Sequence, residues 1–294
     1  MTTIKTRTIS AAGNDISYLE KGEGPLFLCL HGFPDHAGTF RHQLDFFARQ
    51  NFRVVAPYMR GYGPALKTPD PTFAAYDTGS DALALIEALG EEKAIILGHD
   101  WGASAAYAAA YMAPERVSHL ITAAVPYSPK FMQALLKDGD QQRRSWYMFF
   151  FLAPFAEAAV TQNNYAFIDR LWAEWSPGWE VDQNHLSELK DIFSQGSNLT
   201  AALSYYRDTF GGAAKPGSTD SRFSGYAKKP IDVPTLYLHG QQDGCITPDL
   251  SGGMEALFSK GLTKQFLDGA GHFLHLEKPD LFNSHISQFL KLGK

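Results

Sequence analysis

The sequence has few cysteines and no large excess of charge of either sign. Two cysteines among 294 residues, Cys29 and Cys245, cannot build a disulfide framework. Both lie in or beside apolar runs, so we interpret them as core thiols of a protein from the reducing cytoplasm. The net charge of -5 and the lack of a Lys/Arg cluster argue against nucleic acid as a partner.

Long hydrophobic runs and clusters of metal ligands are also missing. No uninterrupted apolar run reaches the roughly 18 residues that a membrane-spanning helix needs, and no signal-peptide pattern opens the chain. The 10 histidines are scattered rather than spaced as metal ligands. We therefore expect a cytoplasmic protein without metal, cofactor or membrane contact, whose 45% hydrophobic residues bury a sizeable core.

The most informative stretch runs from Gly98 to Gly102. An apolar run at 94–97 precedes it and an alanine-rich segment at 103–112 follows it, which predicts a strand, a sharp turn and a helix. The two glycines flank the turn, where a tight backbone leaves no room for side chains. This pattern is typical of a nucleophile elbow, written G-x-S-x-G in its serine form, with Asp100 in the central position here.

An aspartate in this position predicts a different reaction from a serine. With a reference pKa near 3.9, the carboxylate is already ionised at neutral pH and needs no base in order to attack. Carboxylates attack amides and esters poorly, but they displace a leaving group from a saturated carbon that is held in line. The product is an ester on Asp100, so the chain must also supply a histidine that activates water and an acid that orients it.

Strand-like and helix-like segments alternate on both sides of a central insertion. The expected strands lie at 5–9, 16–20, 26–30, 53–56, 94–97, 117–123, 235–239 and 264–267, and the expected helices at 40–49, 76–89, 103–112 and 280–292. This alternation predicts an α/β fold with a mostly parallel sheet flanked by helices. We divide the chain into residues 1–126 as the first part of an α/β-hydrolase core, 127–228 as an inserted helical lid and 229–294 as the second part of the core.

The insertion contains no convincing strand and is rich in aromatic residues. It holds four of the 5 tryptophans, which are Trp146, Trp172, Trp175 and Trp179. A helical insertion just beyond the C-terminal end of a sheet strand is expected to cover the crevice in which such sheets bind ligands. Most of these aromatic side chains should form the core of the lid, and only a few should reach an apolar substrate.

Candidates for the acid and the base follow two later strands. Asp243 lies in the loop after the strand at 235–239, and His272 lies in a glycine-rich loop after the strand at 264–267. The order of nucleophile, acid and base along the chain is then the order of the α/β-hydrolase fold. His275 is a rival base, but it lacks the flanking glycines, and we expect it to pack on the following helix.

With these motifs the chain resembles the epoxide hydrolases of the α/β-hydrolase fold, whose neighbours are the haloalkane and haloacid dehalogenases. The resemblance covers nearly the full length. H-G-F-P at 31–34 matches the oxyanion-loop motif H-G-x-P, G-H-D-W-G at 98–102 matches the nucleophile motif, and G-H-F at 271–273 resembles the motif of the base. The resemblance implies a triad of Asp100, His272 and Asp243, an oxyanion hole from the backbone N–H groups of Phe33 and Trp101, and no cofactor.

The leaving group distinguishes an epoxide from a halide. An opening epoxide releases an alkoxide that must receive a proton, whereas a halide needs only N–H donors. In the epoxide hydrolases two lid residues, usually tyrosines, hydrogen-bond the epoxide oxygen. The string L-S-Y-Y-R at 203–207 resembles the second tyrosine motif and implies Tyr206 as one donor. The string W-Y-M-F-F at 146–150 resembles the first motif and suggests Tyr147, although a shift of one residue would place Trp146 there as a substrate contact.

Three alternatives remain at this point. A dehalogenase would hold a halide with Trp101 and Trp146, although Phe33 stands where haloalkane dehalogenases have asparagine, and the residue after Asp100 is not the arginine of haloacid enzymes. A non-catalytic receptor is a second alternative, since fold does not fix function. A serine esterase is disfavoured because Ser104 lies on the helix. We expect a hydrolase that opens a small apolar epoxide to a vicinal diol, and a homodimer stays open as its assembly.

Overall fold

A computed structural model describes residues 4–63, 71–211 and 230–292. Within these ranges eight strands form one sheet in the order β1-β2-β4-β3-β5-β6-β7-β8. The first two strands pair antiparallel, as do β2 and β4, and every pair from β4 to β8 is parallel. The strands are β1 (Lys5–Ala11), β2 (Asn14–Lys21), β3 (Leu26–Leu30), β4 (Arg53–Pro57), β5 (Ala94–His99), β6 (Val117–Ala123), β7 (Thr235–Gly240) and β8 (Leu262–Leu267). The mostly parallel sheet predicted from the sequence is confirmed.

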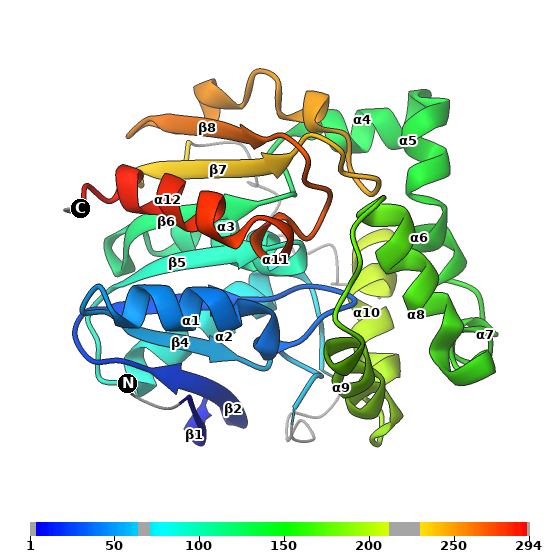
Figure 1. The fold of residues 1–294 in the computed structure, drawn as a ribbon, viewed down its shortest axis with the longest axis horizontal. Coiled ribbons are helices and arrows are strands. Elements are labelled where there is room, and N and C mark those ends of the chain that lie inside the picture. Colours follow the sequence, from blue (N-terminus) through cyan, green and yellow to red (C-terminus); the bar gives the residue numbers. More distant parts are fainter. Residues whose placement is uncertain (1–3, 64–70, 212–229, 293–294) are drawn as a thin grey trace.

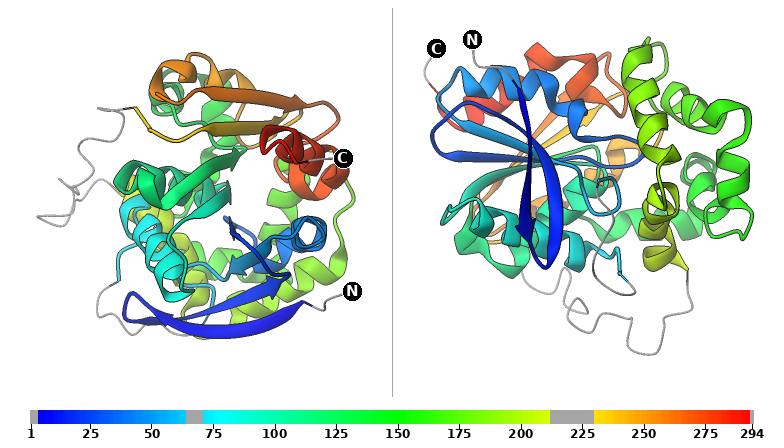
Figure 2. Two further views of the ribbon diagram at one scale, coloured as in Figure 1. Left: turned by 90° about the vertical axis from the view of Figure 1, so that its left-hand side faces the viewer. Right: turned by 90° about the horizontal axis from the view of Figure 1, so that it is seen from below.

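Helices cover both faces of the sheet (Figure 1 and Figure 2). Helices α1 (Arg41–Ala48) and α12 (Pro279–Phe289) pack on one face, and α2 (Ala75–Ala88) and α3 (Trp101–Met112) pack on the other. In β3, the side chains of Phe27 and Cys29 lie in the core on the α1 and α12 face, and those of Leu28 and Leu30 lie in the core on the α2 and α3 face. Successive side chains of a strand point to opposite faces, so a strand covered on both sides is apolar throughout.

The insertion between β6 and β7 is helical, as expected from its lack of strand patterns. Its helices are α4 (Pro129–Lys137), α5 (Gly139–Arg144), α6 (Trp146–Phe150), α7 (Ala156–Val160), α8 (Gln162–Trp175), α9 (Gln183–Ser194) and α10 (Asn198–Phe210). They lie beyond the C-terminal ends of the parallel strands (Figure 1). The end of the predicted lid, at residue 228, lies outside the described residues.

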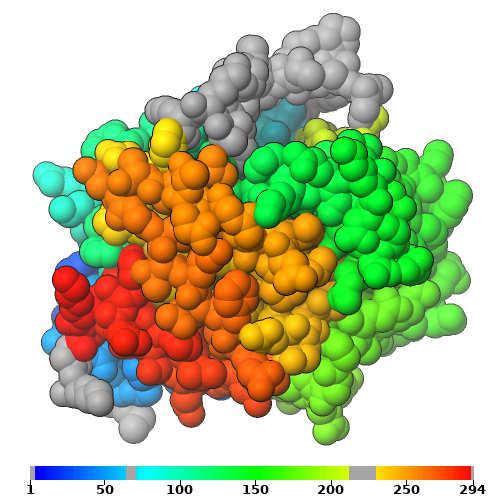
Figure 3. All heavy atoms as spheres, turned by 90° about the horizontal axis from the view of Figure 1, so that it is seen from above, coloured from blue at the N-terminus to red at the C-terminus, as the bar shows by residue number. Residues whose placement is uncertain are grey.

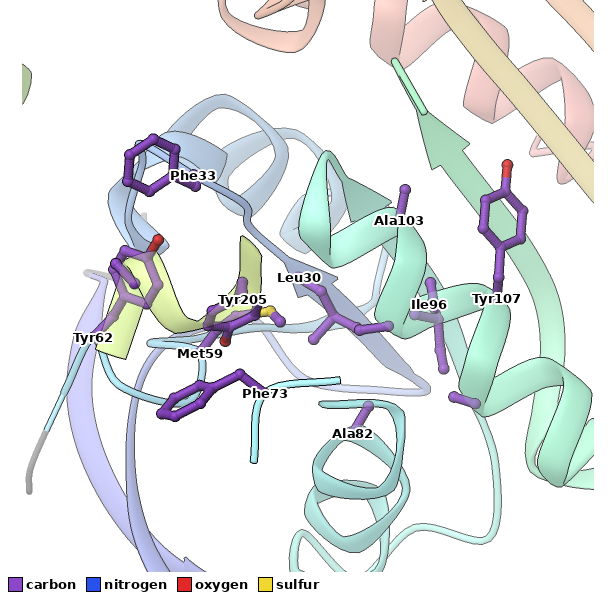
Figure 4. Packing of buried hydrophobic residues seen from close by; sticks show 14 of the residues in the cluster. Leu30, Phe33, Met59, Tyr62, Phe73, Ala82, Ile96, Ala103, Tyr107 and Tyr205 are labelled. Carbon is purple, nitrogen blue, oxygen red and sulfur yellow. The ribbon is translucent and has the colours of Figure 1, made fainter. Parts of the chain in front are cut away.

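Aromatic side chains hold the lid against the core. Tyr205 of α10 lies against Phe73, with ring centroids 5.4 Å apart, and its hydroxyl donates to the carbonyl of Arg60 at 2.8 Å (Figure 4). The Trp172 indole of α8 donates to the carbonyl of Pro34 at 2.8 Å. A space-filling view shows the lid (green) packed against the segment after β7 (yellow and orange; Figure 3). No helix among the described residues is long and apolar enough to span a bilayer.

Candidate active site

The nucleophile elbow predicted from the sequence is present at the turn between β5 and α3. Asp100 has φ 53° and ψ -121°, a conformation that costs backbone strain in any residue except glycine. A Cβ on Gly98 would lie 2.2 Å from the carbonyl oxygen of Gly102, and one on Gly102 would lie 1.9 Å from that of Leu30. Both positions therefore require glycine, and the strained turn lifts Asp100 above the sheet.

The oxyanion loop after β3 meets the nucleophile closely. A Cβ on Gly32 would lie 2.3 Å from Oδ1 of Asp100, so only glycine allows this approach. The backbone N–H of Phe33 donates to that same Oδ1 at 2.8 Å. Trp101 is the first residue of α3, where the backbone N–H has no acceptor within the helix. The two predicted oxyanion donors thus come from the loop and from the helix start that flank Asp100.

The structure brings together the acid and the base that the sequence predicts. Nδ1 of His272 lies 2.9 Å from Oδ2 of Asp243, and its Nε2 lies 3.6 Å from Oδ2 of Asp100. The other oxygen of Asp243, Oδ1, accepts the backbone N–H groups of Cys245 at 2.7 Å and Ile246 at 3.0 Å. The imidazole therefore sits between two carboxylates, one held rigidly by the backbone and one on the elbow.

A second histidine, His239 of β7, also contacts the acid and was missed by the sequence analysis. Its Nε2 lies 2.9 Å from Oδ2 of Asp243 and 3.0 Å from the carbonyl oxygen of Ile246. Both partners are acceptors, so Nε2 carries the proton and Nδ1 accepts the hydroxyl of Tyr237. The available signal was a polar side chain four residues before Asp243, near the end of a mostly apolar strand.

Burial and charge act in opposite directions on this group of residues. Burial alone would raise the pKa of Asp243, but the His272 charge and the hydrogen bonds from His239 and His272 hold it well below its usual range. Burial alone would lower the pKa of His272, but Asp243 and then Asp100 raise it to about 10. The surroundings of His272 in the free protein therefore favour the protonated imidazolium over the neutral ring.

Two lid tyrosines lie above the nucleophile. The rings of Tyr147 of α6 and Tyr206 of α10 lie 5.7 Å apart, and both are buried. The Tyr206 hydroxyl finds no hydrogen-bond partner among the described residues, whereas the Tyr147 hydroxyl lies 3.2 Å from Sγ of Cys245. Burial raises the pKa of both phenols well above the usual value. Both tyrosines therefore stay protonated and can donate.

Trp146, the other candidate for the first lid position, lies elsewhere. Its ring packs on Phe150 and Phe167, and the Arg170 guanidinium lies 4.8 Å from its centroid. Consecutive helical residues point about 100° apart, so Trp146 and Tyr147 of α6 face different surroundings. The contact between the Tyr147 and Tyr206 rings favours Tyr147 over Trp146 as the partner of Tyr206. Tyr206 lines the cavity beside Asp100, whereas neither Tyr147 nor Trp146 is among its described lining residues.

The cavity beside Asp100 has a volume of about 280 Å³. Its lining comes from the elbow, α3, the loops after β6 and β7, and lid helices α4, α6 and α10. The residues are Asp100, Trp101, Ser104, Tyr107, Val125, Pro126, Tyr127, Ser128, Pro129, Phe131, Met132, Met148, Tyr206, Thr209, Phe210 and Ile246. Asp100 is the one charged side chain among these described residues, so the cavity suits a small apolar molecule.

The histidines gather more closely in the fold than their scatter along the chain indicates. Among the residues that the structure describes, three groups place potential ligand atoms within 4.8 Å of one another, namely Asp35 with His99 and His275, Asp35 with His36 and His185, and Asp243 with Cys245 and His272. His185 of the lid already hydrogen-bonds Asp35 at 2.7 Å, and the rings of His36 and His185 are stacked, with centroids 4.2 Å apart. Stacked rings direct their in-plane lone pairs side by side rather than at one ion. The third group is the acid and base already described.

The rival base His275 has a packing role, as expected. Its Nε2 lies 2.6 Å from the Thr39 hydroxyl, and its ring packs against Phe282 of α12, with centroids 5.9 Å apart. The side chain is fully buried below the loop that carries His272. It therefore supports the site from beneath rather than facing the nucleophile.

Comparisons with known proteins agree with this geometry. The chain is 30% identical over 291 residues to the AB hydrolase superfamily protein YfhM of Bacillus subtilis, which covers 97% of this chain and 94% of that protein. It is 29% identical over 285 residues to Epoxide hydrolase 1 of Caenorhabditis elegans, covering 94% of this chain and 67% of that protein. The structure of a Bacillus megaterium epoxide hydrolase with an inhibitor superposes with a TM-score of 0.83 at 27% identity, covering 97% and 100% of the two chains. Residues 25–279 match the family described as alpha/beta hydrolase fold, and the chain belongs to that family.

Proposed function

We propose that the protein is an epoxide hydrolase that converts a small apolar epoxide into a vicinal diol. The observation that carries this assignment is the buried, unpartnered hydroxyl of Tyr206 above an aspartate nucleophile. A protonated phenol in that place supplies the proton that an opening epoxide needs and that a departing halide does not need. Several relatives of this chain bear the name epoxide hydrolase, which supports the same reaction.

The first step forms an ester. Asp100 attacks one ring carbon from the side opposite the oxygen, and the carbon–oxygen bond breaks as the new bond forms. Tyr206, with Tyr147 beside it, donates a hydrogen bond to the epoxide oxygen and then a proton. The step leaves a hydroxyalkyl ester on Asp100 and one tyrosinate, so the negative charge moves from the carboxylate to the phenol.

Ester formation prepares the base for the second step. Asp100 is one of the two carboxylates that raise the pKa of His272 to about 10, and as an ester it carries no charge. The pKa of His272 therefore falls, and the imidazolium gives up a proton while the tyrosinate needs one. The proton that His272 loses equals the proton that the tyrosinate gains, so the exchange leaves a neutral imidazole and a neutral phenol.

The second step hydrolyses the ester. Neutral His272 takes a proton from water, and the oxygen of that water attacks the carbonyl carbon of the Asp100 ester. Charge develops on the oxygen that accepts the N–H of Phe33, with the N–H of Trp101 as the second proposed donor. In other hydrolases the loss of one such donor costs about 2.7–4 kcal/mol. The tetrahedral intermediate collapses, and the bond between the Asp100 carbonyl carbon and the alkyl oxygen breaks as that oxygen takes the proton from His272. The diol leaves, and the Asp100 carboxyl returns its proton to His272, which restores the carboxylate.

The test is the intact mass of a His272→Ala variant after incubation with a panel of epoxides and matched alkyl halides. Without the base the ester should accumulate, and an added mass equal to the whole epoxide supports the proposal. Asp100→Asn combined with His272→Ala is the matched control and should stay unmodified. No adduct with any epoxide in the panel contradicts the proposed function.

One observation favours a second candidate, a dehalogenase. The buried indole N–H of Trp101 also lacks a hydrogen-bond partner among the described residues, and an N–H donor of this kind stabilises a departing halide. The same mass experiment separates the two reactions. An adduct equal to the alkyl halide less its halogen, with no epoxide adduct, would assign the protein to dehalogenation.

A further inference from the structure

The cavity lies on one side of the nucleophile. Strands β3 and β6 are the two neighbours of β5 in the sheet, so the loops that follow them flank Asp100 from opposite sides. On the β6 side the cavity is lined by the loop 125–128, by the start of α4 and by Ile246 after β7, and residues of α3, α6 and α10 complete the lining. Its open space therefore extends from Asp100 in one direction across the sheet.

The β3 side of the nucleophile is filled by aromatic rings. Phe33, which follows β3, packs against Phe151 with ring centroids 5.2 Å apart and against Phe193 with centroids 6.0 Å apart. Phe33 and Phe151 are 0% exposed, whereas Asp100, which lines the cavity, is 6% exposed. A side chain without exposed surface borders no space wide enough for water, so no such space lies beside Phe33 or Phe151. The β3 side thus offers no room for a substituent.

Tyr206, which we propose as the hydrogen-bond donor to the epoxide oxygen, lies between the open cavity and the filled β3 side. Tyr206 lines the cavity, and its ring also contacts Phe33 at 5.3 Å and Phe151 at 5.0 Å between centroids. An epoxide whose oxygen faces the Tyr206 hydroxyl therefore lies at the boundary between the open and the filled sides. A substituent on one ring carbon can enter the cavity, and a substituent on the other carbon leaves the ring in a diverging direction, toward the rings of Phe33 and Phe151.

We propose that the substrates are terminal epoxides, which carry their apolar substituent on one ring carbon and an unsubstituted CH₂ as the other. This inference rests on the proposed function. A cavity of about 150 Å³ holds benzene in another protein, so about 280 Å³ accepts an aryl group or a short alkyl chain. With Asp100 as the one charged lining residue described, the substituent is uncharged.

The first test compares three related compounds on the unmodified protein and on His272→Ala. The first is phenyloxirane. The second is phenyloxirane with a methyl group added to the unsubstituted ring carbon, and the third is the isomer of the second that carries the methyl group on the phenyl-bearing carbon. We expect kcat/KM and the rate of ester formation to fall by about tenfold or more for the methyl on the second carbon. The other isomer adds equal volume on the cavity side and should stay closer to the parent compound.

The outcomes separate this inference from the proposed function. Equal rates for the terminal and the internal epoxide would overturn the terminal-epoxide inference while leaving epoxide hydrolysis intact. Failure of His272→Ala to form an ester with any of the three would count against the proposed function itself.

A pair of lid variants gives a second test. Phe151→Ala opens space on the β3 side and should raise the ratio of internal to terminal epoxide turnover. Phe149→Ala is the matched control, because Phe149 of the adjoining helix α6 is 48% exposed and should leave the ratio unchanged. The ratio is measured within one protein, so partial loss of folded protein cancels. An unchanged ratio in Phe151→Ala would contradict the inference.

Discussion

The core and the lid hold their functional groups in different ways. The core fixes Asp100 by a strained backbone and glycines that cannot be replaced, and it fixes Asp243 by backbone and histidine N–H donors on both oxygens. The lid places Tyr206 by ring contacts with Phe33, Trp101 and Phe151, with centroids 5.0–5.3 Å apart, and leaves its hydroxyl without a described partner. Rigid backbone therefore positions the proposed nucleophile and acid, and ring packing positions the proposed proton donor.

This contrast has a consequence for mutation. A change at the elbow or the oxyanion loop displaces a reacting atom, and a shift of about 1 Å can cost a hundredfold in rate. A change in the lid weakens a hydrogen bond that a neighbouring tyrosine can partly replace. Core substitutions should therefore be severe at each position, whereas lid substitutions should become severe only in combination.

The largest effect is expected from removing the nucleophilic charge. Asp100→Asn should lower diol formation by about 10⁴-fold or more, because an amide cannot form the ester. Diol release is measured on freshly purified protein, and intact mass excludes deamidation back to aspartate. Turnover near the original rate by a protein that still carries asparagine would show that the core does not supply the nucleophile.

The next effect concerns the oxyanion loop. Gly32→Ala should reduce turnover by about a hundredfold, because its Cβ would lie 2.3 Å from Oδ1 of Asp100 and force the two segments apart. Gly139→Ala is the matched control, since its Cβ would meet nothing closer than Arg143 at 3.8 Å. Steady-state kinetics and far-UV circular dichroism distinguish a displaced site from an unfolded one. Equal activities of the two variants would remove the argument for a backbone-fixed core site.

The lid should show graded losses. Tyr206→Phe should slow ester formation by about tenfold or more and Tyr147→Phe by less, because the Tyr147 hydroxyl already has Cys245 as a partner. The double variant should lose about 10³-fold, and Trp146→Phe should stay near the original rate. Single-turnover mass measurements give these rates. A Trp146→Phe loss larger than that of Tyr147→Phe would place the tryptophan in the site and reverse the assignment.

The smallest effect concerns the second histidine on the acid. His239→Asn withdraws the Nε2–H donor from Asp243. The Asp243 carboxylate then shares its negative charge with fewer donors and interacts more strongly with His272, so the pKa of His272 should rise. Hydrolysis needs neutral His272, so the rise of its rate with pH should move to higher pH. His239→Gln, whose amide nitrogen reaches the place of Nε2, should restore the original profile. NMR titration of His272 reports the same shift without substrate, and identical titrations in both variants would contradict this role.

The sequence indicated the core site because its constraints are local. A strained elbow needs glycine at positions 98 and 102, a close approach needs glycine at 32, and strand ends place Asp243 and His272 at the same edge of the sheet. Each of these requirements restricts the residue type at one fixed position in the chain, so it can be recognised in the sequence. The same reasoning was incomplete where distant segments meet, and it missed His239 on Asp243 and the buried pair of Asp35 with the lid residue His185.

By itself the sequence determined the fold family and predicted which residues serve as nucleophile, acid and base, with the glycines around them, since parallel strands must deliver these groups to one edge. Only the tertiary structure decided that Tyr147 faces Tyr206 while Trp146 packs outward, because adjacent helical residues are equally compatible with a short motif. It also decided which side of Asp100 is open. That side depends on how Phe33, Phe151 and Phe193, from three separate segments, fill the space together.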